Sequence, residues 1–281
     1  MSRLRIVMLT LLAMLAFAGN SLLCRLALKQ TPIDAASFTV IRLISGAAML
    51  WILVKARGRA QEGRGSWTSA AALFVYAAGF SFAYTLLNAA TGALLLFGAV
   101  QTTMIGYGIW AGERMRLAQT IGFALAICGL LVLLLPGAYA PPLKACILMI
   151  CAGLAWGFYS LRGRGLGDPT QVTAGNFLRA VPMAILLSLL MRQDLVFDAS
   201  GLCFAVMSGA VTSGIGYAIW YTAVPSLKAT TAATVQLSVP VVAALGGVLF
   251  LGEDLTFPIV GASCAILGGI ALVIHNKETA A

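Results

Sequence analysis

Polar but uncharged side chains occur at several positions inside the strongly apolar segments of this 281-residue chain. In apolar surroundings an amide or a hydroxyl needs a hydrogen-bond partner, which either a polar ligand or a neighbouring helix can supply. Tyr84 and Asn88 are four residues apart, so a continuous helix would place them on one face. We expect this group to recognise the polar part of a small molecule, with helix-to-helix bonding as the alternative: Asn20, Tyr84, Asn88, Gln101, Gln236 and Ser238.

Aromatic residues form a second group of candidate binding residues. Tryptophan and tyrosine rings stack on planar or apolar ligand groups, and their faces attract a cationic amine. Tyr217 and Tyr221 are again four residues apart. Single aromatic residues in apolar helices more often serve packing, so the prediction rests on the set as a whole: Trp156, Tyr159, Tyr217 and Trp220.

Three arginines lie within or at the edge of apolar segments. An unpaired charge in a membrane helix costs at least about 2.5–3.5 kcal/mol, so Arg42 and Arg179 must face protein or water. One of them could bind a carboxylate. Alternatively both bond helix-end carbonyls, a structural role that their corresponding positions in the two halves of the chain favour. Arg25 lies nearer to a segment end, where it can be a gating charge or an anchor at the membrane surface.

The sequence offers little for catalysis or metal binding. All nine carboxylates lie in expected loops or at helix ends, and the single histidine, His275, is close to the C-terminus. The six cysteines are scattered without a C-x-x-C spacing. We find no Ser/His pair, intramembrane acid pair or metal-ligand cluster in the sequence, so we expect neither an enzyme nor a protein that uses a metal or another cofactor.

The composition indicates which elements position these side chains. Hydrophobic residues make up 60% of the chain and charged residues 10%, whereas soluble chains have about 45–50% apolar residues with glycine included. Charge clusters and Gly/Pro turns separate apolar runs that are long enough to cross roughly 30 Å of hydrocarbon as helices. We predict an all-α membrane protein with ten transmembrane helices near 5–28, 34–54, 68–88, 91–111, 117–135, 143–161, 171–191, 199–222, 229–251 and 257–275.

Basic residues divide unequally between the two sides of this arrangement. With a cytoplasmic N-terminus, twelve Lys and Arg residues lie on the cytoplasmic side, and only Lys29, Lys144 and Arg192 lie on the other. This division agrees with the positive-inside rule and predicts that both termini are cytoplasmic. It also explains the net charge of +9 by orientation in the lipid bilayer, and we expect no nucleic-acid partner.

The two halves of the chain carry corresponding features. Arg42 corresponds to Arg179, and Gly112-Glu113 at the end of the fourth predicted helix corresponds to Gly252-Glu253 at the end of the ninth. Each half, 1–138 and 139–281, holds five predicted helices, and because five is odd the second half must enter the membrane from the opposite side. Inverted repeats around a central cavity are a basis of alternating access in transporters, so the repeat predicts a carrier.

Ten helices in two such halves, with Gly-Glu ending the fourth helix of each, resemble the drug/metabolite transporter superfamily. The chain resembles its EamA-type bacterial branch, and within that branch the aromatic amino acid exporters. This resemblance implies an inner-membrane carrier whose cavity is lined mainly by the first, third, fourth, sixth, eighth and ninth helices. The motifs that carry it are Ala155-Trp156-Gly157-Phe158-Tyr159-Ser160, Gly175-Asn176-Phe177-Leu178-Arg179 and Gln236-Leu237-Ser238-Val239-Pro240.

We therefore expect a carrier that exports amino acids, with aromatic and other apolar side chains preferred. The alternative is an exporter of drugs or other small metabolites with the same fold. The lack of membrane carboxylates weakens the case for cationic drugs, as well as for the proton coupling of the small multidrug resistance relatives. Glycines in the fifth and tenth helices allow close packing within the chain or against a second copy, which leaves a homodimer open.

Overall fold

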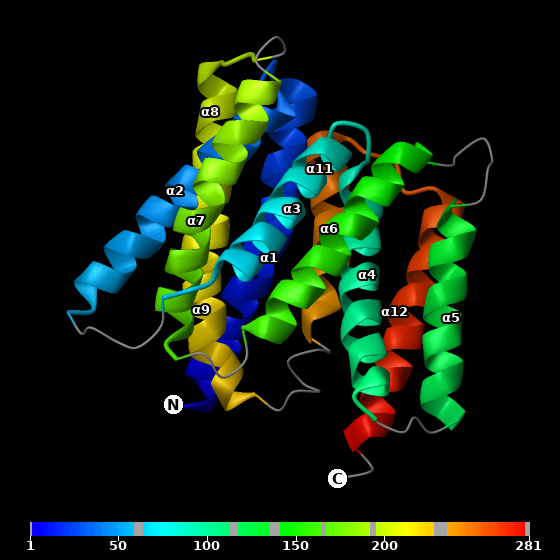
Figure 1. Ribbon diagram of the computed structural model, residues 1–281. Helices are drawn as coiled ribbons and strands as arrows, with labels where there is room; N and C mark the ends of the chain where they lie inside the picture. Colours follow the sequence, from blue (N-terminus) through cyan, green and yellow to red (C-terminus); the bar gives the residue numbers. More distant parts are fainter. Residues whose placement is uncertain are drawn as a thin grey trace.

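The computed structural model describes residues 2–58, 64–112, 117–134, 141–163, 167–191, 195–227 and 235–278. These residues form helices and no strands (Figure 1). If the consecutive segments from Ala199 to Ser226 are taken as one, the described residues form ten helical segments. They are α1 (Arg3–Gln30), α2 (Ala35–Ala56), α3 (Trp67–Tyr84), α4 (Ala89–Trp110), α5 (Leu117–Leu134), α6 (Leu143–Arg162), α7 (Pro169–Leu190), the eighth segment described below, α11 (Ser238–Leu251) and α12 (Phe257–Glu278).

Short polar side chains set where many of these helices begin. Each such residue precedes the first helical residue and accepts a hydrogen bond from a free backbone N–H of the first turn, which stabilises a helix start by about 1 kcal/mol. Three of these capping residues are aspartates, which the sequence predicts in loops or at helix ends. The capping residues are Asp34 for α2, Ser66 for α3, Asn88 for α4, Asp168 for α7 and Asp198 for α8 (Ala199–Val206).

The predicted helices agree closely with most of these segments, and the third and the eighth need correction. The third helix was predicted to reach residue 88, but α3 ends at Tyr84 and Asn88 caps the next helix through a 2.8 Å bond from the Thr91 N–H. Tyr84 and Asn88 therefore do not share one helical face. The predicted start of the ninth helix, at 229, and the boundary between the predicted halves, at 138, lie outside the described residues.

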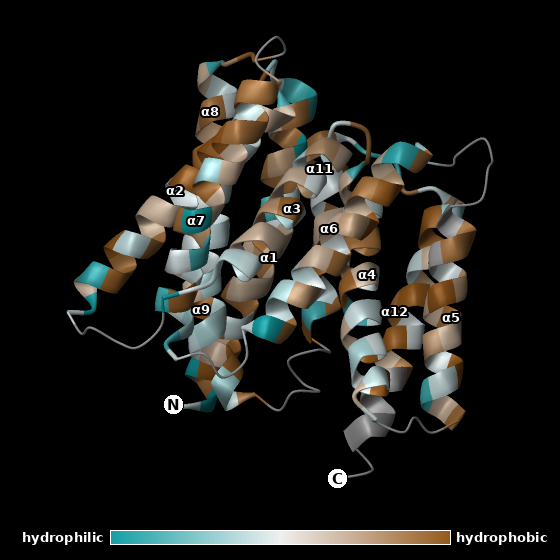
Figure 2. Ribbon diagram, in the orientation of Figure 1, coloured by the Kyte–Doolittle hydropathy of each residue, from teal (hydrophilic) through white to brown (hydrophobic). Residues whose placement is uncertain are grey.

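The outer surface of the helices is apolar. Six described segments are long and apolar enough to cross a membrane: α1, α2, α4, α6, α7 and Ala199–Ser226. Shorter apolar helices are found at Leu117–Gly129, Ser238–Leu251 and Phe257–Leu272. Many large hydrophobic side chains are exposed, among them Trp110 and Phe257, and hydrophobic residues cover most of the helix lengths in Figure 2. Because so much exposed apolar surface requires lipid as the solvent, the chain is a multi-pass membrane protein.

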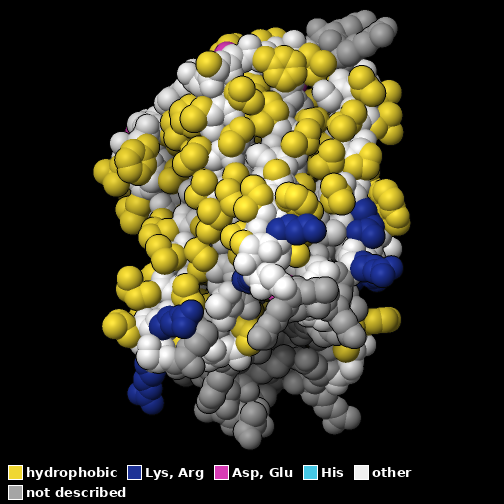
Figure 3. Space-filling view, turned by 90° about the vertical axis from the view of Figure 1, so that its left-hand side faces the viewer, with side chains coloured by type: hydrophobic (Ala, Val, Ile, Leu, Met, Phe, Trp, Pro, Cys, Tyr) yellow, Lys and Arg dark blue, Asp and Glu magenta, His cyan; other side chains and the backbone are white. Residues whose placement is uncertain are grey.

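The start of α1 and the end of α12 lie at the same end of the bundle (Figure 1). Figure 3, which keeps the vertical direction of Figure 1, shows that Lys and Arg side chains on one face occupy the half nearer to that end. Hydrophobic side chains cover most of the described surface in the other half of this face. We call this end of the bundle the terminal end, and the other the distal end.

Helices that are far apart in the sequence pack against each other. α2 lies against α7, α3 and α4 lie against α6, and α1 lies against both α11 and the eighth segment. At one side of the bundle α5 packs against α12 (Figure 1). Gly129 and Gly269 belong to this last contact, since a Cβ on either would meet atoms of the partner helix at less than 3 Å. These two glycines of the predicted ladders thus serve packing within the chain.

The eighth segment departs from the continuous helix predicted over 199–222. It consists of α8 (Ala199–Val206), a π-helical stretch η2 (Met207–Ile215), α9 (Gly216–Ala223) and a 3₁₀ turn η3 (Val224–Ser226). π-Helical insertions of this kind are frequent at functional sites. In η2, Gly209 packs against α2 so closely that an added Cβ would collide with the Arg42 carbonyl oxygen and the Ser45 hydroxyl.

This contact leads to a stability prediction. Gly209→Ala is expected to lower the unfolding free energy by about 1–3 kcal/mol, because overpacking forces the α2 backbone to shift. Thermal unfolding of the purified protein in detergent measures the change. Gly261→Ala is the matched control, since nothing lies within 4 Å of a Cβ at that position. Equal melting temperatures for both variants would contradict the tight α2–η2 contact.

Candidate functional site

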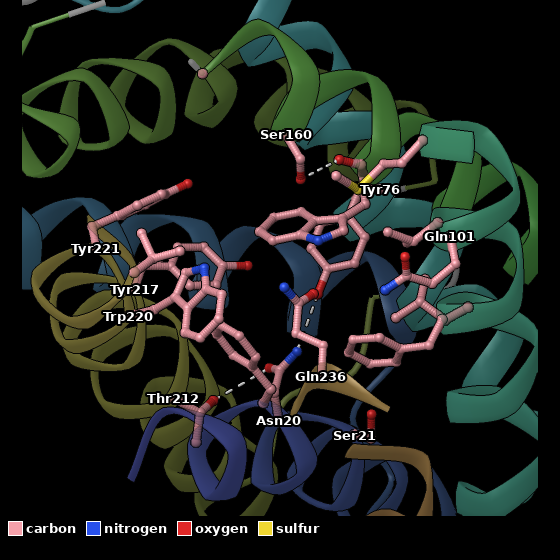
Figure 4. Close-up of a pocket in the computed structure, with 18 of the residues that line it drawn as sticks. Asn20, Ser21, Tyr76, Gln101, Ser160, Thr212, Tyr217, Trp220, Tyr221 and Gln236 are labelled. Carbon is pink, nitrogen blue, oxygen red and sulfur yellow. Dashed lines mark hydrogen bonds between the residues drawn. The ribbon is translucent and has the colours of Figure 1, made fainter. Parts of the chain in front are cut away.

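A cavity of about 480 Å³ lies between the helices of the bundle, with its walls supplied by α1, α3, α4, α6, η2 and α9. Gly163, Pro169 and Leu227 at the terminal end belong to its lining, so the cavity reaches toward that end. None of the described residues that line it carries a charged side chain. Its polar lining consists of amides and hydroxyls, and much of the rest is aromatic (Figure 4). A site of this composition suits a small molecule with a polar end and an apolar or planar part.

A hydrogen-bonded cluster around Asn20 forms the polar wall. The side-chain oxygen of Asn20, Oδ1, accepts hydrogen bonds from the hydroxyls of Ser208 (2.7 Å) and Thr212 (3.3 Å), both in η2. Its amide nitrogen donates to the Tyr76 hydroxyl oxygen at 3.3 Å. These contacts hold the Asn20 side chain in one orientation, and no described residue accepts its second amide hydrogen, which can therefore bind a ligand.

Trp156 is at the centre of the aromatic wall. Its ring centroid lies 4.8 Å from that of Tyr76, 5.3 Å from Tyr159 and 5.1 Å from Tyr217. Phe17 contacts Tyr217 and Trp220 edge-on, at 5.8 and 5.9 Å. Rings at these distances support each other and keep the wall rigid, so it can stack on a flat or apolar group without reorganising.

Two further amides point into the cavity. In Figure 4 the side chains of Gln101, from α4, and Gln236, just before α11, are directed toward the space between Tyr76 and Asn20. Gln101 is buried in the protein except for its cavity side. Each amide offers both a donor and an acceptor, so the pair can adapt to either kind of ligand atom.

At the distal end, an ion pair joins four helices. Arg25 Nε lies 2.9 Å from Glu253 Oε1, and the two side chains are 11% and 6% exposed. Arg25 also donates to the carbonyl oxygens of Tyr84 and Thr85 at the end of α3. Glu253 Oε2 accepts the backbone N–H of Ala89, the first residue of α4, at 2.7 Å. This cluster therefore links α1, α3 and α4 to the C-terminal end of α11.

The cluster lies directly beyond the cavity. Arg25 is four residues after the cavity residue Ser21 on α1, and so occupies the same helical face one turn closer to the distal end. Residues at both ends of the α3–α4 connection bond to the pair. The protein is thus bonded together at the distal end of the cavity, while the cavity reaches toward the terminal end.

Arg42 and Arg179 occupy corresponding positions but differ in their contacts. Arg179 donates to the backbone carbonyls of Arg64 and Gly175, as in the structural role considered from the sequence. Arg42 is 1% exposed and donates from Nη2 to the Tyr76 hydroxyl at 3.0 Å. Its guanidinium also lies over the rings of Tyr76 and Phe80, at 5.2 and 4.9 Å from their centroids.

The described residues contain no group of three or more His, Cys, Asp and Glu side chains that could hold a metal ion. The six cysteines are all free thiols.

The comparisons with known proteins agree with this architecture. Residues 143–275 match the EamA-like transporter family. The uncharacterized protein PA1977 of Pseudomonas aeruginosa is 59% identical over 97% of this chain and 96% of its own length. The chain belongs to the EamA-like transporter family. This family is part of the drug/metabolite transporter superfamily, so membership assigns the chain to membrane transport and not to catalysis.

More distant relatives of this EamA-like protein are also transporters. An uncharacterized transporter of Archaeoglobus fulgidus is 22% identical over 88% of this chain and 89% of its own length. The threonine/homoserine exporter RhtA of Escherichia coli is 27% identical, but the match covers only 48% of each chain. A solved crystal structure with 20% identity superposes with a TM-score of 0.69 and covers 97% of this chain and 98% of its own, which supports the fold over the whole length.

The EamA-like bundle brings six of the predicted binding residues together and places four elsewhere. Tyr84 is fully buried between α3 and α4, Asn88 caps α4, and Tyr159 accepts a bond from Asn176 behind Trp156. Ser238 is exposed and donates to the Val235 carbonyl. These four residues lie outside the cavity lining, and their binding roles stay predictions. The six that line the cavity are Asn20, Gln101, Trp156, Tyr217, Trp220 and Gln236.

Several lining residues were absent from the predicted set. Tyr76 could have been found, because Tyr76, Phe80 and Tyr84 continue one helical face of α3 at intervals of four. Thr212 has no comparable signal, since its position depends on the π-helical register of η2. The remaining additions of note are Phe17, Ser21, Ser160 and Tyr221.

Proposed function

We propose that this EamA-like protein is an inner-membrane carrier that exports amino acids, with aromatic or other apolar side chains preferred. The observation that carries the proposal is the cavity itself, in which one wall presents amides and hydroxyls around Asn20 and the other presents rings around Trp156. A zwitterionic head group needs several donors and acceptors, whereas its side chain gains from aromatic contacts. The resemblance of half the chain to the threonine/homoserine exporter RhtA supports the amino acid class.

Alternating access between two inverted five-helix repeats would drive the transport. Support comes from the packing of the helices, taken in order as first to tenth. The second lies against the seventh, the fourth against the ninth and the fifth against the tenth. The third helix contacts the sixth just as the eighth contacts the first. In the same way, the fourth helix contacts the sixth as the ninth contacts the first. A pseudo-twofold axis that relates each helix to the fifth one after it would generate this pattern.

The Arg25–Glu253 cluster would be the closed gate of the inward-facing state. Basic residues gather near the terminal end on the face in Figure 3, which favours a cytoplasmic position for that end and for both termini. The cavity would then be accessible from the cytoplasm and blocked toward the outside by bonds that connect α1, α3, α4 and α11. Export would require this cluster to separate after the substrate is bound.

Counterflow in proteoliposomes tests the proposal. Vesicles with reconstituted protein and loaded with unlabelled phenylalanine or tryptophan are expected to accumulate the labelled amino acid transiently, above the level in empty vesicles. A panel that includes threonine, homoserine and a cationic drug measures the substrate range at two pH values. A signal no higher than in protein-free vesicles across all amino acids would exclude amino acid transport.

A further inference from the structure

Arg42 is a buried cation without an anionic partner in the described part of the chain. Its Nε and Nη1 atoms have no hydrogen-bond partner, and only Nη2 is bonded, to the Tyr76 hydroxyl. The described ion pairs are Arg25–Glu253 and Arg57–Asp168, neither of which includes Arg42. An uncompensated charge in a membrane protein is costly and often marks a functional site. Arg179 differs in this respect, because backbone carbonyls accept its hydrogen bonds.

Tyr76 connects Arg42 to the cavity, because it bonds to the guanidinium and also lines the cavity. Its hydroxyl oxygen accepts one hydrogen bond from Arg42 Nη2 at 3.0 Å and another from Asn20 Nδ2 at 3.3 Å. A phenolic oxygen has two lone pairs, so both are occupied, and its own hydrogen must point elsewhere. No described residue accepts that hydrogen, and Tyr76 lines the cavity beside Asn20 (Figure 4). The hydroxyl is therefore a donor that lacks an acceptor.

We propose that Tyr76, with Arg42 behind it, binds a carboxylate of the transported molecule. A hydroxyl that accepts a bond from a guanidinium is a stronger donor, and the positive charge favours an anionic acceptor over a neutral or cationic one. The free amide hydrogen of Asn20 points from the same cluster and can donate to the second carboxylate oxygen. The inference deepens the proposed function, because it assigns the end of the cavity that recognises the acidic group.

The aromatic wall completes this arrangement. The Tyr76 ring lies 4.8 Å from Trp156, so a carboxylate at the Tyr76 hydroxyl is attached to a molecule that extends along the aromatic wall. Described lining residues include no Asp or Glu to pair with a cation. The cavity should accordingly prefer an aromatic acid to its amide or to the corresponding amine.

Binding to the purified protein tests the inference without requiring transport. The probes are 3-phenylpropionate, its neutral amide 3-phenylpropionamide and the cation phenethylamine. They are titrated against the tryptophan fluorescence of the full chain in detergent. We expect the wild-type protein to bind the acid about tenfold or more tightly than the amide, since bonds to charged groups are the stronger ones. Equal binding of acid and amide, or no binding of the acid, would overturn the inference.

Tyr76→Phe then separates recognition from packing. The ring stays beside Trp156 while the hydroxyl is lost, so the acid-to-amide preference is expected to fall to near one with little change in amide affinity. Arg42→Lys keeps a charge and should retain part of the preference. Tyr107→Phe removes the hydroxyl of a tyrosine in α4 that is 49% exposed and lies outside the cavity lining, so it should leave the ratio unaltered. An unchanged ratio in Tyr76→Phe refutes the assignment. Counterflow tests amino acid transport separately. A failure of the proposed transport function can therefore be distinguished from a failure of the carboxylate site.

Discussion

Glutamine in place of Glu253 is expected to open the cavity toward the distal side. In the wild-type structure both carboxylate oxygens are used, one by Arg25 at 2.9 Å and one by the Ala89 N–H at 2.7 Å. Removing one charge of a buried ion pair costs about 3–5 kcal/mol, because the other charge remains buried without compensation. Each 1.4 kcal/mol is a tenfold change in an equilibrium constant. The closed state should therefore lose at least tenfold in population relative to the open state.

Cysteine labelling measures this shift. A cysteine at Ser21, in a background without the six native cysteines, is exposed to a membrane-impermeant maleimide from outside the cell. Glu253→Gln is expected to raise its labelling rate by at least about tenfold.

Asp168→Asn is a matched control for the labelling experiment. It neutralises the partner of Arg57 in a more exposed pair at the terminal end, separated by 3.7 Å, where ion pairs contribute about 0–1 kcal/mol. Asparagine can also still cap α7. Equal external labelling in Glu253→Gln and its parent would refute the gate.

Alanine in place of Trp156 is expected to reduce transport of aromatic substrates by tenfold or more. Trp156 is in contact with the rings of Tyr76, Tyr159 and Tyr217, so its removal deletes the surface on which an apolar group would rest and loosens its neighbours. Replacing a large, packed aromatic residue by alanine lowers the unfolding free energy by about 3–5 kcal/mol, which indicates how much its contacts contribute. Initial counterflow rates over a range of phenylalanine concentrations measure the loss in apparent affinity and rate.

Trp110→Ala is the control for the loss of a tryptophan as such. Trp110 ends α4 with 82% of its surface exposed and lies outside the cavity lining. Its replacement should leave the counterflow kinetics nearly unchanged. Trp156→Phe should retain part of the activity, because a smaller ring can still stack on its neighbours. Wild-type kinetics in Trp156→Ala would exclude the aromatic wall from substrate binding.

Much of the helix pattern could be read from the sequence because it depends on local properties. Apolar run length and capping residues such as Asp34 and Asp168 act within a few residues, so they can be recognised along the chain. The predictions of the third and eighth helices were less accurate, and the reasons are local as well. Asn88 was assigned to the end of the third helix although it caps the next one, and the π-helical η2 has no period that a helical pattern predicts.

The candidate site followed from the sequence only in part. Residue type indicated that Asn20, Gln101 and Trp156 could bind a ligand, and the structure places all three in the cavity lining. Gln236 and Ser238 were predicted together, yet Gln236 precedes α11 and lines the cavity, whereas Ser238 is the first residue of α11 and is exposed. Residue type alone could not choose between them.

Composition, charge distribution and helix length thus determined by themselves that the chain crosses the membrane several times. The partner of each polar group was decided by the tertiary structure. Arg25 meets Glu253 across 228 residues of sequence and Asn20 meets Tyr76 across 56, because the packing of distant helices brings them together. The same packing distinguishes Arg179, which bonds to backbone carbonyls, from Arg42, whose Nε and Nη1 find no partner among the described residues. Such pairings depend on side-chain direction in three dimensions, which spacing along one helix does not specify.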